Sequence, residues 1–156
     1  MKSTLALLAS LVAASPDGKC RVLAMRGGGI HGAFEVGVLK AFTDTLKPID
    51  YHYDVLSGVS VGALNTGMLS VWDYGKEKEA VAFLERLYTD NLVQDFWDFW
   101  PTVVFEPFFK TSFVDVTKFR KILHEMMDGK KIKRKFSIQS VDLITGKVVI
   151  FDESVE

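Results

Sequence analysis

The stretch "YDVLSGVSVGALNTG", residues 53–67, places Ser60 between two glycines, where an apolar run gives way to helix-forming residues. A short apolar run of this kind is typical of a buried strand, and the residues after the serine favour a helix. Gly58 and Gly62 remove the side chains that would crowd a serine held on a sharp strand-to-helix turn. The stretch therefore predicts a reactive serine on such an elbow, and the alternative is a Gly/Ser loop that matches by chance.

A second glycine loop, "RGGGIHG" at 26–32, also follows an apolar run and opens a helix. The N–H groups of Gly28 and Gly29 could converge there with no side chain in the way, as an oxyanion hole requires. The N–H of Val61 would be a further donor, because it lies at the positive end of the helix after Ser60. Adjacent parallel strands would bring the two loops side by side at their carboxyl ends.

The order of the remaining elements predicts an α/β fold with parallel strands, because strand, loop and helix alternate twice. Apolar patterning predicts strands at 20–25, 51–58, 135–143 and 147–152, and helices at 31–46, 61–72, 76–91 and 114–127. The last two strands are expected to form a hairpin around "ITGK". Cys20, beside the first strand, is expected to be a small buried residue.

Composition excludes several classes of function. The chain has 156 residues, which suits one domain, and its 48% hydrophobic and 25% charged residues are typical of a globular protein. A net charge of −1 gives no basic field for nucleic acid, so no nucleic-acid partner is expected. One cysteine and three scattered histidines offer no metal-ligand spacing, so we expect no metal and no cofactor.

Residues 1–15 have the layout of a secretory signal peptide: one lysine, an apolar run from Leu5 to Ala14, and small residues before a cleavage site near Ala14 or Ser15. The run is shorter than the ~20 residues that span a bilayer. The alternative is a buried first helix. The signal-peptide interpretation predicts entry into the secretory pathway and a secreted or lumenal protein.

The glycine loop also matches GxGxxG, the fingerprint of dinucleotide-binding proteins. That class needs an acidic residue at the tip of the second strand, ~20 positions on, to hold the ribose. Here Asp54 stands at the start of that strand, and the serine elbow occupies its tip. The pattern therefore argues against a dinucleotide-binding site.

Taken together, "GGGIHG", "EVGVLKAF", "SGVSVGALN" and "VDLITGKVVIFD" resemble the patatin-like phospholipase family, over residues 20–156. The resemblance implies a three-layer α/β/α fold with a mainly parallel sheet, and an acyl hydrolase with a Ser–Asp dyad that degrades phospholipids or other acyl lipids. By position, it implies Ser60 as nucleophile. The residues that it places in the oxyanion loop are Gly27, Gly28, Gly29 and Gly32.

The sequence departs from the family pattern at three points. His31 stands where arginine or lysine is usual, and Arg26 where aspartate or a small polar residue is common. The family's general base is an aspartate in a downstream Asp-Gly turn, and the chain stops at Glu156 before one is reached. The domain is thus expected to be incomplete at its C-terminus. A lipid-binding or regulatory module without turnover is the alternative function.

Two other residues are candidate catalytic partners of the serine. Asp128 belongs to the one Asp-Gly pair after Ser60, but it precedes the "VDLITG" stretch, and a helix-terminating turn is the favoured interpretation. His124 lies within an amphipathic helical pattern, where a structural role is favoured. His31 could touch substrate, although a loop-filling role is favoured.

Two further stretches bear on peripheral membrane contact. The aromatic stretch 96–113 could be a lid or an interfacial patch, but filling the core is the favoured interpretation. The basic run "GKKIKRK", 129–135, could steer anionic headgroups, although a solvated entrance to a strand is favoured.

Overall fold

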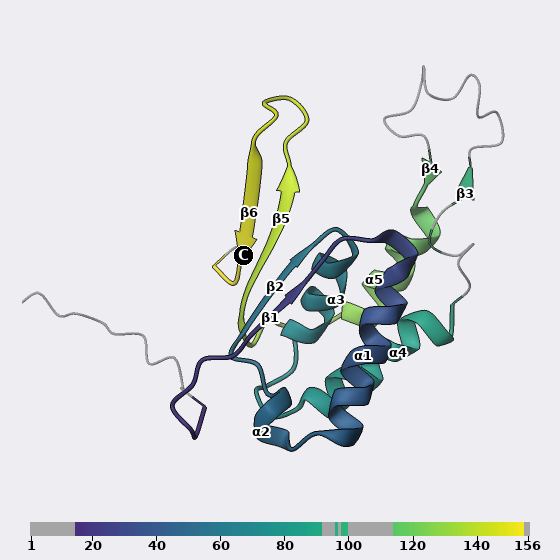
Figure 1. Cartoon of the computed structure of the whole chain (residues 1–156). Coiled ribbons are helices and arrows are strands. Elements are labelled where there is room, and N and C mark those ends of the chain that lie inside the picture. Colours follow the sequence, from purple (N-terminus) through teal and green to yellow (C-terminus); the bar gives the residue numbers. More distant parts are fainter. Residues whose placement is uncertain (1–14, 92–95, 97, 100–113, 155–156) are drawn as a thin grey trace, which may run out of the picture.

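The computed structural model describes residues 15–91, 96, 98–99 and 114–154 (Figure 1). The predicted signal peptide, except for Ser15, and most of the aromatic stretch 96–113 lie outside the described residues. No helix in the described ranges combines the length and the apolarity needed to cross a bilayer.

The main sheet has four strands in the order β1-β2-β5-β6 (Figure 1). They are β1 (Val22–Met25), β2 (Val55–Val59), β5 (Lys135–Val141) and β6 (Val148–Asp152). β2 pairs in parallel with both β1 and β5, whereas β6 runs antiparallel to β5 as the predicted hairpin. Two short strands, β3 (Asp98–Phe99) and β4 (Val114–Asp115), form a separate antiparallel pair.

The described helices gather on one side of this sheet (Figure 1). They are a 3₁₀ turn η1 (Gly29–His31), α1 (Gly32–Thr45), α2 (Pro48–Tyr51), α3 (Val61–Ser70), α4 (Glu77–Thr89) and α5 (Thr117–Met127). Helix α3 packs on β2 and β5, and α1 and α4 pack on each other and on α3. The predicted α/β class, with a mostly parallel sheet and packed helices, is confirmed, and the second helical layer of the predicted three-layer α/β/α fold stays a prediction.

The core forms where alternate strand residues face α3. Leu56 of β2 is aligned with Leu23 of β1 and with Phe136 of β5, and all three belong to or pack against one apolar cluster. The neighbouring positions on β1 face the other way, and Val22 is 56% exposed. The helix-facing side of the sheet therefore supplies the core in the described chain.

Two expectations about local structure were wrong. The strand predicted at 51–58 begins only at Val55, because Pro48 supplies the first residue of the short helix α2, a position that proline favours. Cys20 is exposed, because it precedes β1 and does not belong to it.

The basic run 129–135 is exposed as predicted except at Arg134, which the prediction of a solvated strand entrance did not anticipate. Arg134 is buried, and its guanidinium donates to Glu77 Oε1 at 2.7 Å and to the carbonyl oxygens of Trp72 and Asp73 at 2.6 and 2.7 Å. A buried charge needs such partners to offset its lost hydration. Arg134 therefore anchors the start of β5 and does not face anionic headgroups.

Candidate active site

Ser60 stands on the turn between β2 and α3, in a backbone conformation that is rare for residues with a side chain. Its φ and ψ are 57° and −125°, and it is the one non-glycine residue with positive φ in the described part of the chain. Such a conformation costs of order 1–3 kcal/mol and persists only where surrounding contacts enforce it. The serine is exposed, and its Oγ has no hydrogen-bond partner among the described residues.

The two glycines that flank Ser60 are required by close packing. A methyl group on Gly58 would collide with the carbonyl group of Gly62 and would approach Thr66 Oγ1 to 2.5 Å. A methyl group on Gly62 would collide with the carbonyl group of Met25 and would lie 2.7 Å from that of Arg26. The first turn of α3 thus packs directly against the end of β1.

The glycine loop lies against this elbow. A methyl group on Gly27 would lie 3.1 Å from Ser60 Cβ and 3.8 Å from Ser60 Oγ. A methyl group on Gly32 would collide with the Val61 side chain and lie 2.7 Å from the Tyr88 hydroxyl. The structure therefore brings the predicted loop residues and Ser60 to one point at the carboxyl edge of the sheet, as their order on adjacent parallel strands indicates.

Free amide donors border Ser60 on both sides. The N–H groups of Gly28 and Gly29 make no hydrogen bond within the described chain, and Gly29 adopts a φ of +57° that glycine tolerates. Val61 is the first residue of α3, so its N–H has no partner inside the helix. The arrangement provides donors for an anionic oxygen, and their role in catalysis stays a prediction.

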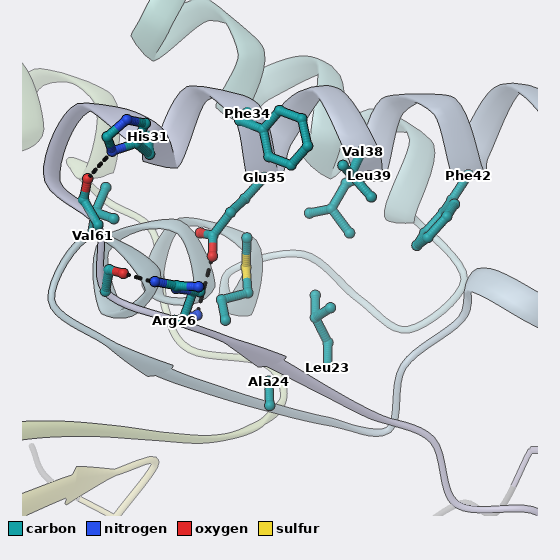
Figure 2. A pocket seen from close by; sticks show the side chains of 13 residues that line it. Leu23, Ala24, Arg26, His31, Phe34, Glu35, Val38, Leu39, Phe42 and Val61 are labelled. Carbon is teal, nitrogen blue, oxygen red and sulfur yellow. Dashed lines mark hydrogen bonds between the residues drawn. The ribbon is translucent and has the colours of Figure 1, made fainter.

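Two of the three departures from the family pattern, His31 and Arg26, have a local structural role. His31 Nδ1 lies 2.8 Å from the Gly28 carbonyl oxygen, which also accepts from the His31 N–H at 3.1 Å. The Arg26 N–H donates to Glu35 Oε1 at 3.1 Å, and the Arg26 side chain reaches back to the Gly27 carbonyl at 3.4 Å (Figure 2). These contacts hold the glycine loop in shape.

A buried polar network supports the loop from behind, and the sequence analysis did not identify it. Asn65 of α3 is fully buried; its Nδ2 donates to the Gly32 carbonyl at 3.2 Å and to Glu35 Oε2 at 3.1 Å. Its Oδ1 accepts from the Tyr88 hydroxyl at 2.6 Å. Burial raises the pKa of Tyr88 to about 12, so this hydroxyl stays protonated and able to donate at neutral pH.

Ser60 opens onto an apolar cavity of about 340 Å³. Its lining comes from the glycine loop, α1, α3, α4, α5 and Phe96: Gly29, Ile30, Ala33, Ser60, Val61, Leu64, Tyr88, Asn91, Phe96, Val116 and Phe119. Phe96 stacks on Tyr88 and contacts Phe119, with ring centroids 5.9 and 5.1 Å apart. This one described ring at the start of the aromatic stretch packs as the core-filling interpretation requires; Trp97 and 100–113 lie outside the described residues.

A larger hollow of about 650 Å³ lies between β1 and α1, on the other side of the glycine loop. Leu23, Phe34, Leu39 and Phe42 surround it, as Figure 2 shows. Its lining does not include Ser60, so the larger of these two cavities is not the candidate active site. We take the smaller cavity as the candidate site because it contains the serine.

No candidate general base among the described residues lines the serine cavity. The lining of the serine cavity includes no carboxylate and no histidine. Asp128 is exposed just after α5, next to Gly129 with a φ of +67°, as expected of a helix-terminating turn, and His124 is exposed on α5. In the same ranges, no three His, Cys, Asp or Glu side chains come together as metal ligands.

An exposed serine on a strained strand-to-helix turn, beside a loop with free amides and above an apolar cavity, defines an α/β protein of the serine-elbow class. The family model described as patatin-like phospholipase matches residues 23–142. The chain belongs to the patatin-like phospholipase family.

Two curated relatives agree with this assignment. The chain is 34% identical over 77 residues to a "cUMP-AMP-activated phospholipase" of Escherichia coli, across 49% of this chain and 22% of that protein. It is 31% identical over 87 residues to "Patatin-like protein 1" of Oryza sativa subsp. indica, across 51% and 21%. The matches thus span about a fifth of the length of these relatives.

Proposed function

We propose that this protein is a serine lipid acyl hydrolase of the phospholipase A or esterase type, with Ser60 as nucleophile. The observation that carries the proposal is the approach of the glycine loop to the elbow: a methyl group on Gly27 would lie 3.1 Å from Ser60 Cβ. Family membership supports acyl-lipid chemistry in general. The apolar cavity at Ser60 suits an acyl chain, whose transfer from water is favourable.

In the proposed reaction, Ser60 Oγ attacks the ester carbonyl carbon and gives up its proton to a base. The carbonyl oxygen becomes an oxyanion, which the N–H groups of Gly28, Gly29 and Val61 would hold. Collapse of the tetrahedral intermediate breaks the carbon–oxygen bond to the leaving alcohol, which takes the proton from the base. Water then attacks the acyl-serine, the carboxylic acid leaves, and the hydroxyl of Ser60 is restored.

The proposed base is an aspartate in the family's Asp-Gly turn, which would complete a Ser–Asp dyad. A serine hydroxyl is a weak nucleophile until a positioned base accepts its proton. Loss of one member of such a catalytic group leaves only residual rates, orders of magnitude lower. We therefore expect the 156-residue chain to hydrolyse esters slowly unless a segment with that turn is joined to it.

The test is hydrolysis of a soluble short-chain nitrophenyl ester and of phosphatidylcholine, by the chain alone and joined to an Asp-Gly segment of a longer family member. We expect the joined protein to be faster and Ser60→Ala to reduce its rate by roughly 10³-fold or more. Ser57→Ala, on the strand β2 that leads to Ser60 but outside the cavity lining, is the matched control and should keep the rate. Equal rates for Ser60→Ala and the parent would show that Ser60 is not the nucleophile.

A lipid-binding or regulatory module without turnover is the second candidate, favoured because no candidate base among the described residues lines the serine cavity. A fluorophosphonate probe applied to the protein with the Asp-Gly segment joined separates the two. Labelling at Ser60 supports the hydrolase. An unlabelled serine in a chain that still binds acyl lipid supports the module.

We also propose that the protein enters the secretory pathway, from the leader-like residues 1–15. Ser15, at the proposed cleavage region, is buried and hydrogen-bonds to Tyr74 at 2.8 Å and to Asp54 at 3.3 Å. N-terminal sequencing of the mature protein tests this proposal: a new N-terminus near Ser15 supports it, and an intact Met1 contradicts it.

A further inference from the structure

The turn of the β5–β6 hairpin carries two large aliphatic side chains that are almost fully exposed. Leu143 is 93% exposed and Ile144 is 95% exposed. They stand next to each other at the tip, between Asp142 and Lys147. Single exposed aliphatic residues are ordinary, but two adjacent and nearly bare ones at a protruding turn mark a contact surface.

This tip projects from the edge of the sheet that carries the candidate site. β2 and β5 are parallel, and Val59, the residue before Ser60, is aligned with Gln139. The chain then continues beyond that level to the tip, about 10 Å further at the rise of a strand. Figure 1 shows the hairpin turn at the end of the sheet where β1 and β2 finish.

Some of the polar groups of the turn are paired within it, which lowers the cost of placing the tip in an apolar surrounding. Asp142 accepts from the Ile144 N–H at 2.9 Å and from the Thr145 hydroxyl at 2.7 Å, and its carbonyl accepts from the Gly146 N–H at 2.8 Å. The Asp142 N–H in turn donates to the Lys147 carbonyl at 2.9 Å. These hydrogen bonds fix the shape of the turn, and its two large aliphatic side chains are exposed.

Charge near the tip limits the depth of any insertion. The Thr145 hydroxyl lowers the pKa of Asp142, which therefore stays ionised at neutral pH and belongs at the level of the headgroups. Lys147 is exposed and forms no ion pair with the described residues, so its ammonium is free to meet lipid phosphate. The two charges balance, and the tip does not repel an anionic surface.

We propose that Leu143 and Ile144 insert into the interfacial region of a phospholipid bilayer and hold the Ser60 edge of the sheet toward the lipid. This inference rests on the proposed function for its choice of partner. The side chains would reach the headgroup–acyl boundary, where amphipathic segments bury their apolar faces. In this proposal the hairpin tip is the membrane-contacting segment, and Arg134 of the basic run is buried away from the lipid.

The experiment measures partition of the 156-residue chain, as Ser60→Ala to prevent turnover, onto phosphatidylcholine vesicles with a minority of phosphatidylglycerol. We expect Leu143→Ser with Ile144→Ser to lower the partition constant by about tenfold or more, because two buried aliphatic side chains are lost. Ile132→Ser is the matched control, since Ile132 is 40% exposed before the opposite end of β5, and its partition should stay within about twofold of the parent. The unfolding midpoint of the tip variant should match that of the parent, because Leu143 and Ile144 are almost fully exposed.

A second measurement does not depend on loss of binding. Ile144→Trp should show a blue-shifted tryptophan emission on adding vesicles, and Ile132→Trp should not. Equal partition of the tip variant and the parent, or no blue shift at position 144, overturns the inference. Self-association of the free chain that the tip substitutions abolish also overturns it, because a second copy would then be the occupant.

The soluble-ester assay keeps this test separate from that of the proposed function. The tip substitutions should leave hydrolysis of a soluble short-chain ester unchanged in the chain with Ser60 intact and the Asp-Gly segment joined. If no variant hydrolyses that ester while vesicle binding still depends on the tip, the proposed function fails and the lipid contact is upheld.

Discussion

The carboxyl edge of the sheet carries two regions that differ sharply in how their conformations are held. At the Ser60 elbow, backbone meets backbone so closely that methyl groups on Gly58 or Gly62 would collide with carbonyl groups. At the β5–β6 hairpin, ladder hydrogen bonds set the pairing, but every residue of β6 is exposed. The elbow is held by packing from several elements, whereas the hairpin tip depends on its own turn. The candidate active site and the proposed contact surface therefore lie at one edge of the sheet, although different interactions hold each of them in place.

The largest expected effect on stability comes from removing Arg134, the buried side chain that anchors the start of β5. Arg134→Met would leave the Glu77 carboxylate buried without its guanidinium partner at 2.7 Å. Removing one partner of a buried ion pair costs about 3–5 kcal/mol. Urea unfolding followed by circular dichroism should show this loss. Lys135→Met, next in sequence but in an exposed ion pair with Glu153, should change stability by less than about 1 kcal/mol. Similar losses for both variants would contradict the buried anchor.

The elbow can be broken by one methyl group. Gly62→Ala should destabilise the protein by about 3 kcal/mol, since the added carbon would collide with the end of β1. The matched control lies on the same helix: a methyl group on Gly67 would meet nothing within 4 Å, so Gly67→Ala should be neutral or stabilising by about 0.5–1 kcal/mol. Denaturation midpoints compare the two. An equal response to both substitutions would show that the elbow is not tightly packed.

A smaller effect tests the polar support behind the glycine loop. Tyr88→Phe removes the donor to Asn65 and should lower stability by about 1 kcal/mol near neutral pH. Burial raises the pKa of Tyr88 to about 12, above the ordinary value of 10.0. Between those pH values the unfolded state loses this proton and the folded state keeps it, so the contribution of Tyr88 to stability falls as pH rises. The difference between parent and variant should therefore narrow from pH 10 to 12. A stability difference that does not change between pH 10 and 12 would show that the Tyr88 hydroxyl is exposed to solvent in the folded protein.

The sequence was informative where local backbone chemistry decides the structure. Gly58, Gly62 and the triple-glycine loop identify both bends, because glycine leaves space that other residues would fill, and the order of elements then implies parallel strands. Arg134 was misjudged and Asn65 missed, since their partners Glu77 and Tyr88 lie 57 and 23 residues away. Nothing in a linear pattern distinguishes a buried arginine in a basic run from its solvated neighbours.

The hairpin tip is a second case in which the sequence pattern does not predict whether a residue is buried or exposed. Alternating apolar residues and the "ITGK" turn predicted two paired strands, and the structure has them. The pattern could not show that Leu143 and Ile144 would remain bare, because exposure depends on which elements pack nearby.

The central claim is that the glycine loop and the Ser60 elbow serve one oxygen atom. The most direct measurement is a crystal structure of the protein with the Asp-Gly segment joined, after reaction with a fluorophosphonate. The account predicts a phosphonyl group on Ser60 Oγ, with its oxygen about 3 Å from the N–H of Val61 and of Gly28 or Gly29. An adduct on another residue, or an oxygen turned away from the glycine loop, would contradict it.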